Sequence, residues 1–177
     1  MDFTEKTLET QKIFSGRIID VRVDTGSLPD GRKTTREVVE HSGAVAIVAV
    51  DDDNNIILVR QYRKPVEGVL LEIPAGTMEK DEEPLECAKR ELREETGFTA
   101  QHWEKILSYY SAPGFTDEYL HLYMAESLTG GEIELDHDEF VETIRVPLQE
   151  AHQLIFQGKI VDGKSIIGIQ YAVGLKK

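Results

Sequence analysis

The chain has 177 residues, 40 % hydrophobic and 30 % charged, which is typical of a soluble globular protein with one sizeable core. Acidic side chains (33) outnumber basic ones (20), and the formal net charge of -13 disfavours generic binding to nucleic-acid backbones or anionic membranes. The single cysteine, Cys87, excludes an intrachain disulfide and a multi-cysteine zinc site.

The first part of the chain is predicted to form an antiparallel β-hairpin. Residues 14–23 (FSGRIIDVRV) have the composition of a strand, and 28–31 (LPDG) carry turn residues. A second strand over 35–41 should return from that turn. We therefore expect an N-terminal β region over residues 1–42 and a core domain over 43–177.

The remainder of the chain is predicted to alternate groups of strands with helices. Residues 44–50 (AVAIVAV) form an uninterrupted apolar run, typical of a strand buried on both faces. Further strands are predicted at 55–61, 69–73, 103–110, 119–125 and 140–146. Helices are predicted from about Pro84 to Gly97, over 147–157 and over 165–175. This order favours a sheet sandwiched between helices over a regular βαβ alternation.

The stretch 76–98 (GTMEKDEEPLECAKRELREETGF) is the most informative part of the sequence. At about 100° per residue, a helix ending at Gly97 places Glu91, Glu94 and Glu95 along one edge. The neighbouring apolar stripe, which would seat the helix on a core, consists of Leu85, Ala88 and Leu92.

Three carboxylates at this spacing repel one another, and two of them lie near the helix C-terminus, where negative charge is unfavourable. A divalent cation would compensate, because Mg²⁺ is commonly held by carboxylates together with substrate phosphates. The alternative is a solvated acidic face partnered by Lys89, Arg90 and Arg93. The residues alone leave both interpretations open.

The same stretch resembles the Nudix box, which is Gly, five residues, Glu, seven residues, Arg-Glu, an aliphatic residue, any residue, Glu-Glu, any residue, Gly and an apolar residue. Its fixed positions are met by Gly76, Glu82, Arg90, Glu91, Leu92, Glu94, Glu95, Gly97 and Phe98. Chance is a poor explanation for so many matches at fixed offsets, and the motif is far more specific than a lone glycine pattern.

Other stretches resemble the ADP-ribose pyrophosphatase branch of the Nudix family. Residues 60–63 (RQYR) and 71–76 (LEIPAG) are similar to the branch's lead-in to the box. Pro113 lies 113 minus 97, or 16, residues beyond the box glycine, as the branch's marker proline does. Residues 138–142 resemble a loop that supplies an extra acid, and 35–46 are a weaker match.

The resemblance implies an α/β/α sandwich with a mixed sheet plus an N-terminal antiparallel β-hairpin region. It also implies Mg²⁺-dependent hydrolysis of ADP-ribose to AMP and ribose 5-phosphate, with Mn²⁺ as a substitute metal. The family's N-terminal hairpin is commonly exchanged between subunits, so a homodimer is expected. The expected partner is this small-molecule substrate, with no nucleic acid or membrane.

The resemblance assigns metal binding to Glu91, Glu95 and Glu94 together with the backbone carbonyl of Ala75. Arg90 would orient these glutamates through ion pairs. The acid that activates water or completes the metal site is predicted to be Glu139, with Asp138 and Glu142 as alternatives. The predicted catalytic set is therefore Glu139, Glu94 and Arg90.

The substrate-binding residues are also implied by the resemblance. Arg63 is predicted to contact phosphate, since its guanidinium suits bidentate charge-assisted bonds. Arg36 and Glu37 resemble positions that contact adenine, and a surface ion pair is the alternative. The remaining substrate-binding predictions are Glu72, Gly114 and Glu118.

Three alternatives stay open or are set aside. The substrate could be another nucleoside diphosphate sugar, a dinucleotide or a damaged nucleoside triphosphate, and a non-catalytic ADP-ribose sensor would keep the fold. Residues 158–165 match the phosphate-binding P-loop expression, but they follow a helical segment instead of a buried strand. We predict a surface turn there.

With a polar N-terminus and no apolar run near about 18 residues, the protein is expected in the cytoplasm, without a signal peptide.

Overall fold

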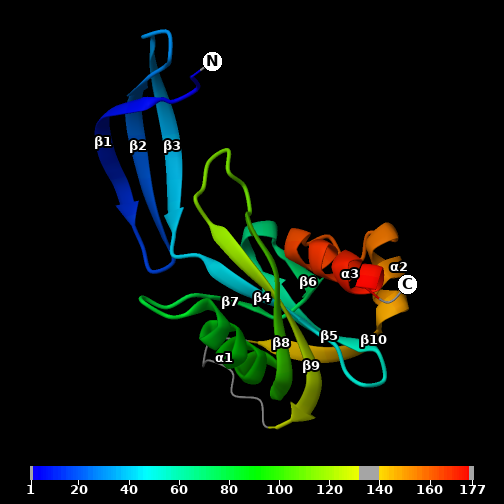
Figure 1. Cartoon of the computed structure of the whole chain (residues 1–177). Helices are drawn as coiled ribbons and strands as arrows, with labels where there is room; N and C mark the ends of the chain where they lie inside the picture. The colour runs from blue at the N-terminus through cyan, green and yellow to red at the C-terminus, as the bar shows by residue number, and fades with distance from the viewer. Residues whose placement is uncertain (1, 132–139, 176–177) are drawn as a thin grey trace. The chain divides into compact units, whose positions relative to one another are not determined.

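The computed structural model describes residues 2–131 and 140–175 of the chain (Figure 1). Its elements, in order, are β1 (Lys6–Ser15), β2 (Ile19–Ser27), β3 (Lys33–His41), β4 (Ala44–Ala49), β5 (Asn55–Arg63), the short 3-10 helix η1 (Lys64–Val66), β6 (Gly68–Glu72), β7 (Ala75–Thr77), α1 (Pro84–Thr96), β8 (Phe98–Tyr110), β9 (Tyr119–Gly130), β10 (Val141–Pro147), α2 (Leu148–Phe156) and α3 (Gly163–Leu175). No helix in this described part of the chain is long and apolar enough to cross a membrane.

Contacts divide the described residues into two compact units. The first takes those within Met1–Gly43 and Tyr109–Leu120, and the second those within Ala44–Ser108 and His121–Lys177. The loop that carries Pro113 therefore groups with the N-terminal strands, together with the adjoining ends of β8 and β9.

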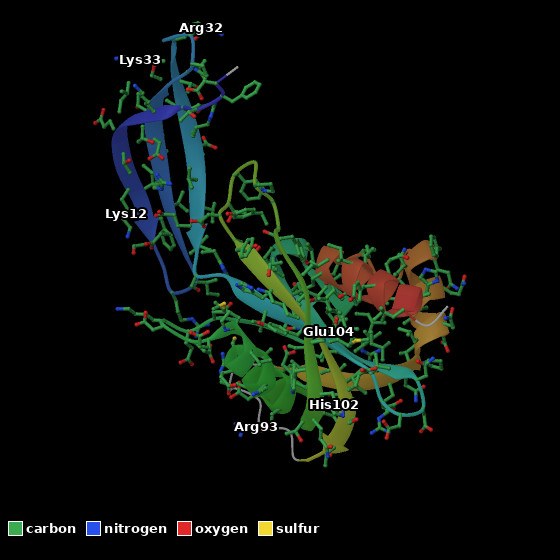
Figure 2. The ribbon with its side chains drawn as sticks, viewed as in Figure 1. Lys12, Arg32, Lys33, Arg93, His102 and Glu104 are labelled. Carbon is green, nitrogen blue, oxygen red and sulfur yellow. The ribbon has the colours of Figure 1, made fainter. Side chains whose placement is uncertain are left out.

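The first unit contains the three-stranded sheet β1-β2-β3, in which both pairs are antiparallel. The predicted turn at 28–31 joins β2 to β3, with Arg32 and Lys33 beside it, while Lys12 lies on β1 (Figure 2). The prediction of one strand over 14–23 is wrong, because the Gly16 amide bonds to the Ile19 carbonyl at 3.0 Å and turns the chain. All residues of β1 are exposed, so no apolar alternation marked this strand in the sequence.

The loop at 111–118 is hydrogen-bonded to β3 within the first unit. Val39 and Thr116 form a parallel bridge, and the Val39 amide donates to the Phe115 carbonyl at 2.8 Å. The His41 amide donates to Asp117 Oδ1, also at 2.8 Å. These contacts attach the loop to β3.

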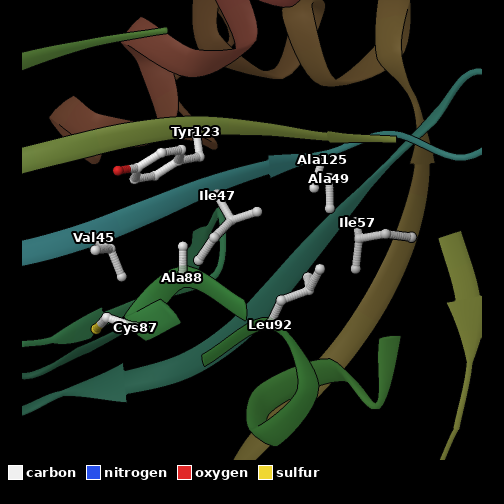
Figure 3. Packing of buried hydrophobic residues seen from close by; sticks show 9 residues of the cluster. All are labelled: Val45, Ile47, Ala49, Ile57, Cys87, Ala88, Leu92, Tyr123 and Ala125. Atoms are coloured by element: carbon white, nitrogen blue, oxygen red, sulfur yellow. The ribbon is translucent and has the colours of Figure 1, made fainter. Parts of the chain in front are cut away.

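The second unit has two sheets, ordered β10-β5-β6 and β7-β4-β9-β8. α1 packs against β4 and β7, whereas α3 packs against β4 from the other side and α2 contacts β5 and β10 (Figures 1 and 3). Every residue of β4 is buried, which agrees with the prediction for the apolar run. The unit is thus layered as helix, strands and helices.

The hydrophobic core below β4 joins this strand to α1. Val45, Ile47 and Ala49 face the helix, and Ala88 and Leu92 of α1 point back toward them (Figure 3). The rest of this cluster consists of Ile57, Cys87, Tyr123 and Ala125. This packing fixes the face that α1 buries and leaves its acidic edge outside the core.

In the second unit, the predicted strands and helices are present with shifted ends. β8 begins at Phe98, five residues before the predicted start at 103. The sequence did not indicate this first part of the strand, because exposed polar residues such as Gln101 and His102 interrupt its apolar pattern. β7 was not predicted: the first residues of the Nudix-box stretch pair with β4, with Gly76 opposite Val45. This short strand places the start of the box next to α1.

Candidate active site

Helix α1 has the ends that its sequence predicts. Pro84 is its first residue, and Gly97 caps it at φ 70°, with its amide donating to the Arg93 carbonyl at 2.8 Å. Ala88 and Leu92 are buried and Leu85 is partly buried, so the predicted apolar stripe does seat the helix. Cys87 is buried as well, and burial raises the pKa of its thiol, as suits a packing residue.

Arg90 gathers the carboxylates along the acidic edge of α1. Its Nε and Nη2 donate to the two oxygens of Glu82 at 2.9 and 3.0 Å, which makes a bidentate pair. Its Nη1 donates to Glu91 at 2.7 Å and to Glu94 at 3.0 Å. These hydrogen bonds hold the pKa of Glu82 near 2, well below its ordinary value. Arg90 thus contacts Glu91 and Glu94, two of the three glutamates that it is predicted to orient.

Glu95 and Glu91 are both held against β7. Glu95 is only 3 % exposed, and its Oε2 accepts a hydrogen bond of 3.1 Å from the Ala75 amide. The Glu91 carboxylate fills the space beside Gly76: a Cβ added there would lie 1.8 Å from Glu91 Cδ. Glycine at this box position therefore leaves room for the Glu91 carboxylate, which any other residue would displace.

The donor set fits a hard divalent cation in its chemistry. Glu91, Glu94 and Glu95 supply carboxylate oxygens, the type of ligand that Mg²⁺ and Mn²⁺ prefer, and the Ala75 backbone contacts Glu95 through its amide. Within residues 2–131 and 140–175, no three His, Cys, Asp or Glu side chains converge in a metal-binding arrangement. Arg90 donates hydrogen bonds to Glu91 and Glu94, and the Ala75 amide donates one to Glu95.

The predicted loop acid is described only in part. Glu139 and Asp138 lie outside the described residues. Glu142 lies on β10, where it is opposite Arg60 of β5 and forms an exposed ion pair with it. Its carboxylate therefore has a cationic partner from the neighbouring strand.

Arg63 forms an ion pair with Glu72, whose carboxylate is almost fully buried. Arg63 Nε and Nη2 donate to the two Glu72 oxygens at 2.9 and 2.7 Å, and Glu72 is 1 % exposed. Burial opposes the charge on Glu72, but the hydrogen bonds from Arg63 and the charge of Lys164 outweigh it and lower the pKa of Glu72. Both Glu72 oxygens accept hydrogen bonds from Arg63, so these contacts favour a role for Glu72 in holding Arg63 over a direct contact with substrate.

Lys164 is a member of this cluster that the sequence reasoning did not assign. It hydrogen-bonds Glu72 and also lies 3.0 Å from Asp162. Lys164 belongs to the P-loop-like stretch 158–165, for which the sequence predicts a surface turn. That prediction is wrong for the end of the stretch, because α3 begins at Gly163 and Ser165 is buried. The stretch does not act as a P-loop, because the Lys164 ammonium group binds two carboxylates. The Lys164 side chain is only 12 % exposed.

The other predicted substrate-binding residues all belong to the first unit. Arg36 and Glu37 are exposed on β3, and Arg36 pairs with Glu5 at 2.7 Å. Gly114 is exposed in the loop paired with β3, and Glu118 lies 4.0 Å from His41 Nε2. Arg36 thus forms a surface ion pair, and its partner is Glu5.

Comparisons with known proteins agree with the box. A model of the NUDIX domain matches residues 40–166, and a model of the nucleoside diphosphate sugar hydrolase N-terminal domain matches residues 5–39. The chain is 48 % identical over 169 residues to the ADP-ribose pyrophosphatase of Bacillus subtilis (strain 168), covering 94 % of this chain and 91 % of that protein. It is 47 % identical over 171 residues to the methanol dehydrogenase activator of Bacillus methanolicus, covering 96 % and 92 %.

Structural comparison gives the same fold. The crystal structure of an ADP compounds hydrolase matches with a TM-score of 0.86 over 99 % of this chain and 96 % of that one, at 22 % identity. This likeness confirms the predicted fold class. The family model, the relatives of similar length and the complete box on α1 together show that the chain belongs to the Nudix family.

Proposed function

We propose that this protein hydrolyses the diphosphate of ADP-ribose to AMP and ribose 5-phosphate with the help of a divalent cation. The observation that carries the proposal is the intact box: Glu95 is buried on the Ala75 amide and the Glu91 carboxylate fills the gap at Gly76. The Bacillus subtilis relative that bears the name ADP-ribose pyrophosphatase supports the choice of substrate.

Glu91, Glu94 and Glu95, with the Ala75 carbonyl, would hold the cation, for which we propose Mg²⁺ with Mn²⁺ as a substitute. When bound, such an ion neutralises phosphate oxygens and lowers the pKa of a bound water. Arg90 keeps two of these glutamates in place through Nη1 and is itself anchored by Glu82. This arrangement orients the acidic edge before the substrate arrives.

Arg63 is the proposed contact for the diphosphate. Its Nε and Nη2 are committed to Glu72, so Nη1 is the group that would donate to a phosphate oxygen. The guanidinium side chain is 38 % exposed although its partner is buried, which leaves it accessible to an anion. Glu139 remains our proposal for the acid that takes the proton of the attacking water.

Contacts to adenine are proposed for Arg36 and Glu37, with Gly114 and Glu118 as further substrate contacts. The match of residues 5–39 to the nucleoside diphosphate sugar hydrolase N-terminal domain supports a substrate-related role for β3 and its neighbours. The same match favours one second candidate, namely hydrolysis of another nucleoside diphosphate sugar.

The test is release of AMP from ADP-ribose by the purified protein with Mg²⁺, beside ADP-glucose, GDP-mannose and NADH and with an EDTA control. Metal-dependent AMP production selective for ADP-ribose is expected. Faster turnover of another sugar nucleotide would keep the chemistry and replace the substrate. Tight binding of ADP-ribose without turnover would instead identify a sensor.

A pair of variants makes this assay specific for the site. Glu95→Gln should cut turnover by about a hundredfold or more, because a buried carboxylate beside the Ala75 amide loses its charge. Glu86→Gln lies on the same helix, where Glu86 forms an exposed pair with Lys89, and should keep wild-type activity. Equal activity of the two variants would overturn the assignment of Glu95.

A further inference from the structure

We propose that Lys164 is a positioning residue for phosphate recognition: it holds the buried carboxylate of Glu72, which in turn fixes the guanidinium of Arg63. The proposal rests on the function proposed above, in which Arg63 contacts the diphosphate. It gives a role to the P-loop-like stretch at 158–165, which that function leaves unused.

The contacts form a chain from α3 to Arg63. Lys164 donates to Glu72 Oε2, the same oxygen that accepts the Nη2 hydrogen bond of Arg63 at 2.7 Å. Glu72 Oε1 accepts from Arg63 Nε at 2.9 Å. A buried carboxylate is therefore shared by two cations, and removal of either cation leaves it poorly compensated.

Lys164 is itself held in place at the start of α3. Its ammonium group lies 3.0 Å from Asp162 Oδ2, and that oxygen also accepts from the Ser165 amide at 3.0 Å and hydroxyl at 2.6 Å. Ser165 Oγ accepts a 2.8 Å hydrogen bond from the amide of Ile73. The residue after Glu72 is thus tied to the residue after Lys164, which sets the distance between the two side chains.

This attachment also reaches the box. Ile73 is two residues before Ala75, whose amide holds Glu95, and the intervening Pro74 carbonyl accepts from the Ile47 amide at 2.8 Å. The start of α3 therefore supports the segment that carries both Glu72 and the Ala75 backbone.

A direct phosphate contact by Lys164 is the competing interpretation of the P-loop-like match. In a P-loop the lysine reaches the phosphates themselves. Here its side chain is 12 % exposed and its ammonium group is engaged by two carboxylates, whereas the Arg63 side chain is 38 % exposed. The geometry gives the anion to Arg63 and places Lys164 behind it.

The experiment measures kcat and KM for ADP-ribose in wild type, Lys164→Met, Lys164→Arg and Arg63→Ala, together with the double variant. Lys164→Met should raise KM about tenfold with a smaller change in kcat, because a misplaced Arg63 weakens binding of the phosphate. Lys164→Arg should restore most of the affinity, since it keeps a cation beside Glu72. Lys159→Met, in the exposed part of the same stretch, is the matched control and should behave as wild type.

The double variant separates positioning from a merely structural role. If Lys164 acts through Arg63, Lys164→Met has no further effect on KM once Arg63 is alanine, so the two changes are not additive. Additive effects, or an unchanged KM in Lys164→Met, would overturn the proposal. If Lys164→Met does not fold, as judged by thermal unfolding, Lys164→Gln takes its place with the same expectations. Wild-type protein without activity would instead refute the proposed function.

Discussion

Single residues at the box show how tightly the site depends on atom-sized space and on charge. Gly76 has a Glu91 carboxylate where any other residue has its Cβ, with Glu91 Oε1 2.0 Å from that position. Arg90 serves as the common partner of three glutamates, of which Glu91 and Glu94 lie on α1 and Glu82 lies just before it. The position of the Glu91 carboxylate therefore depends on two features: the absence of a side chain at Gly76 and the guanidinium of Arg90.

Gly76→Ala should reduce kcat/KM by at least about a hundredfold, because the added methyl group displaces the Glu91 carboxylate from its position. The protein should still fold, since the displaced group is the end of a flexible side chain on the edge of the unit. Gly68→Ala is the matched strand control, because its nearest atom would lie 3.7 Å away. Steady-state kinetics of both variants check this, and an active Gly76→Ala enzyme would contradict it.

Glu82 predicts a specific acid sensitivity. Hydrogen bonds from Arg90 lower its pKa in the folded protein to about 2 from 4.5. A group with a lowered folded-state pKa stabilises the fold above its unfolded pKa and loses that contribution as the pH falls. Between about pH 4.5 and 2, the free energy of unfolding of wild type should therefore fall more steeply than that of Glu82→Gln. Urea unfolding at several pH values measures the free energy of unfolding of both proteins. Parallel plots of this free energy against pH would refute the lowered pKa of Glu82.

At the scale of elements, β4 is the strand on which the second unit is built. Alternate side chains of β4 face α1, while Val48 faces α3 at Gly168. A Cβ at Gly168 would come within 2.6 Å of Val48 Cγ2 and 3.3 Å of Ile73 Cδ1. The absence of a side chain at Gly168 therefore lets α3 pack closely against β4.

Gly168→Ala should lower the free energy of unfolding by about 1–3 kcal/mol, because overpacking forces neighbouring side chains or the backbone to shift. Gly174→Ala on the same helix meets no atom within 4 Å and should be neutral or slightly stabilising, since alanine favours helix. Thermal or denaturant unfolding compares the two. A Gly168→Ala variant as stable as Gly174→Ala would show that α3 adjusts without cost.

At the scale of the whole molecule, the N-terminal strands carry apolar surface that the described chain does not cover. Leu8, Ile13 and Phe14 of β1 are each more than half exposed, and β1 lies at the edge of its sheet. Exposed apolar side chains on an unpaired strand edge mark an interaction surface. We propose a second copy of this chain as the partner, in keeping with the family resemblance.

The wild-type protein should therefore have the mass of a dimer in solution, measured by light scattering after size exclusion. Leu8→Asp combined with Ile13→Asp should shift it to a monomer, because two charges replace apolar contact area. Glu9→Asp, an exposed neighbour with unchanged charge, should stay dimeric. A monomeric wild type would contradict the proposal.

Much of the second unit could be predicted from the sequence, because its signals are local. The apolar run of β4, the proline and glycine at the ends of α1 and the spacing of its glutamates each depend on residues close together in the chain. The box pattern adds a family, which the comparisons confirm. β1, whose residues are all exposed, had no such signal.

The sequence by itself determined the family, the box helix and the set of carboxylates, since local spacing and fixed offsets specify them. Only the tertiary structure decided which distant residues support them. Lys164 and Glu72 are 92 positions apart, and no local pattern links a lysine at the start of α3 to an acid at the end of β6. The loop at 111–118 joins β3 for the same reason. Such contacts are set by how the strands and helices pack, because packing brings together groups that the chain order keeps apart.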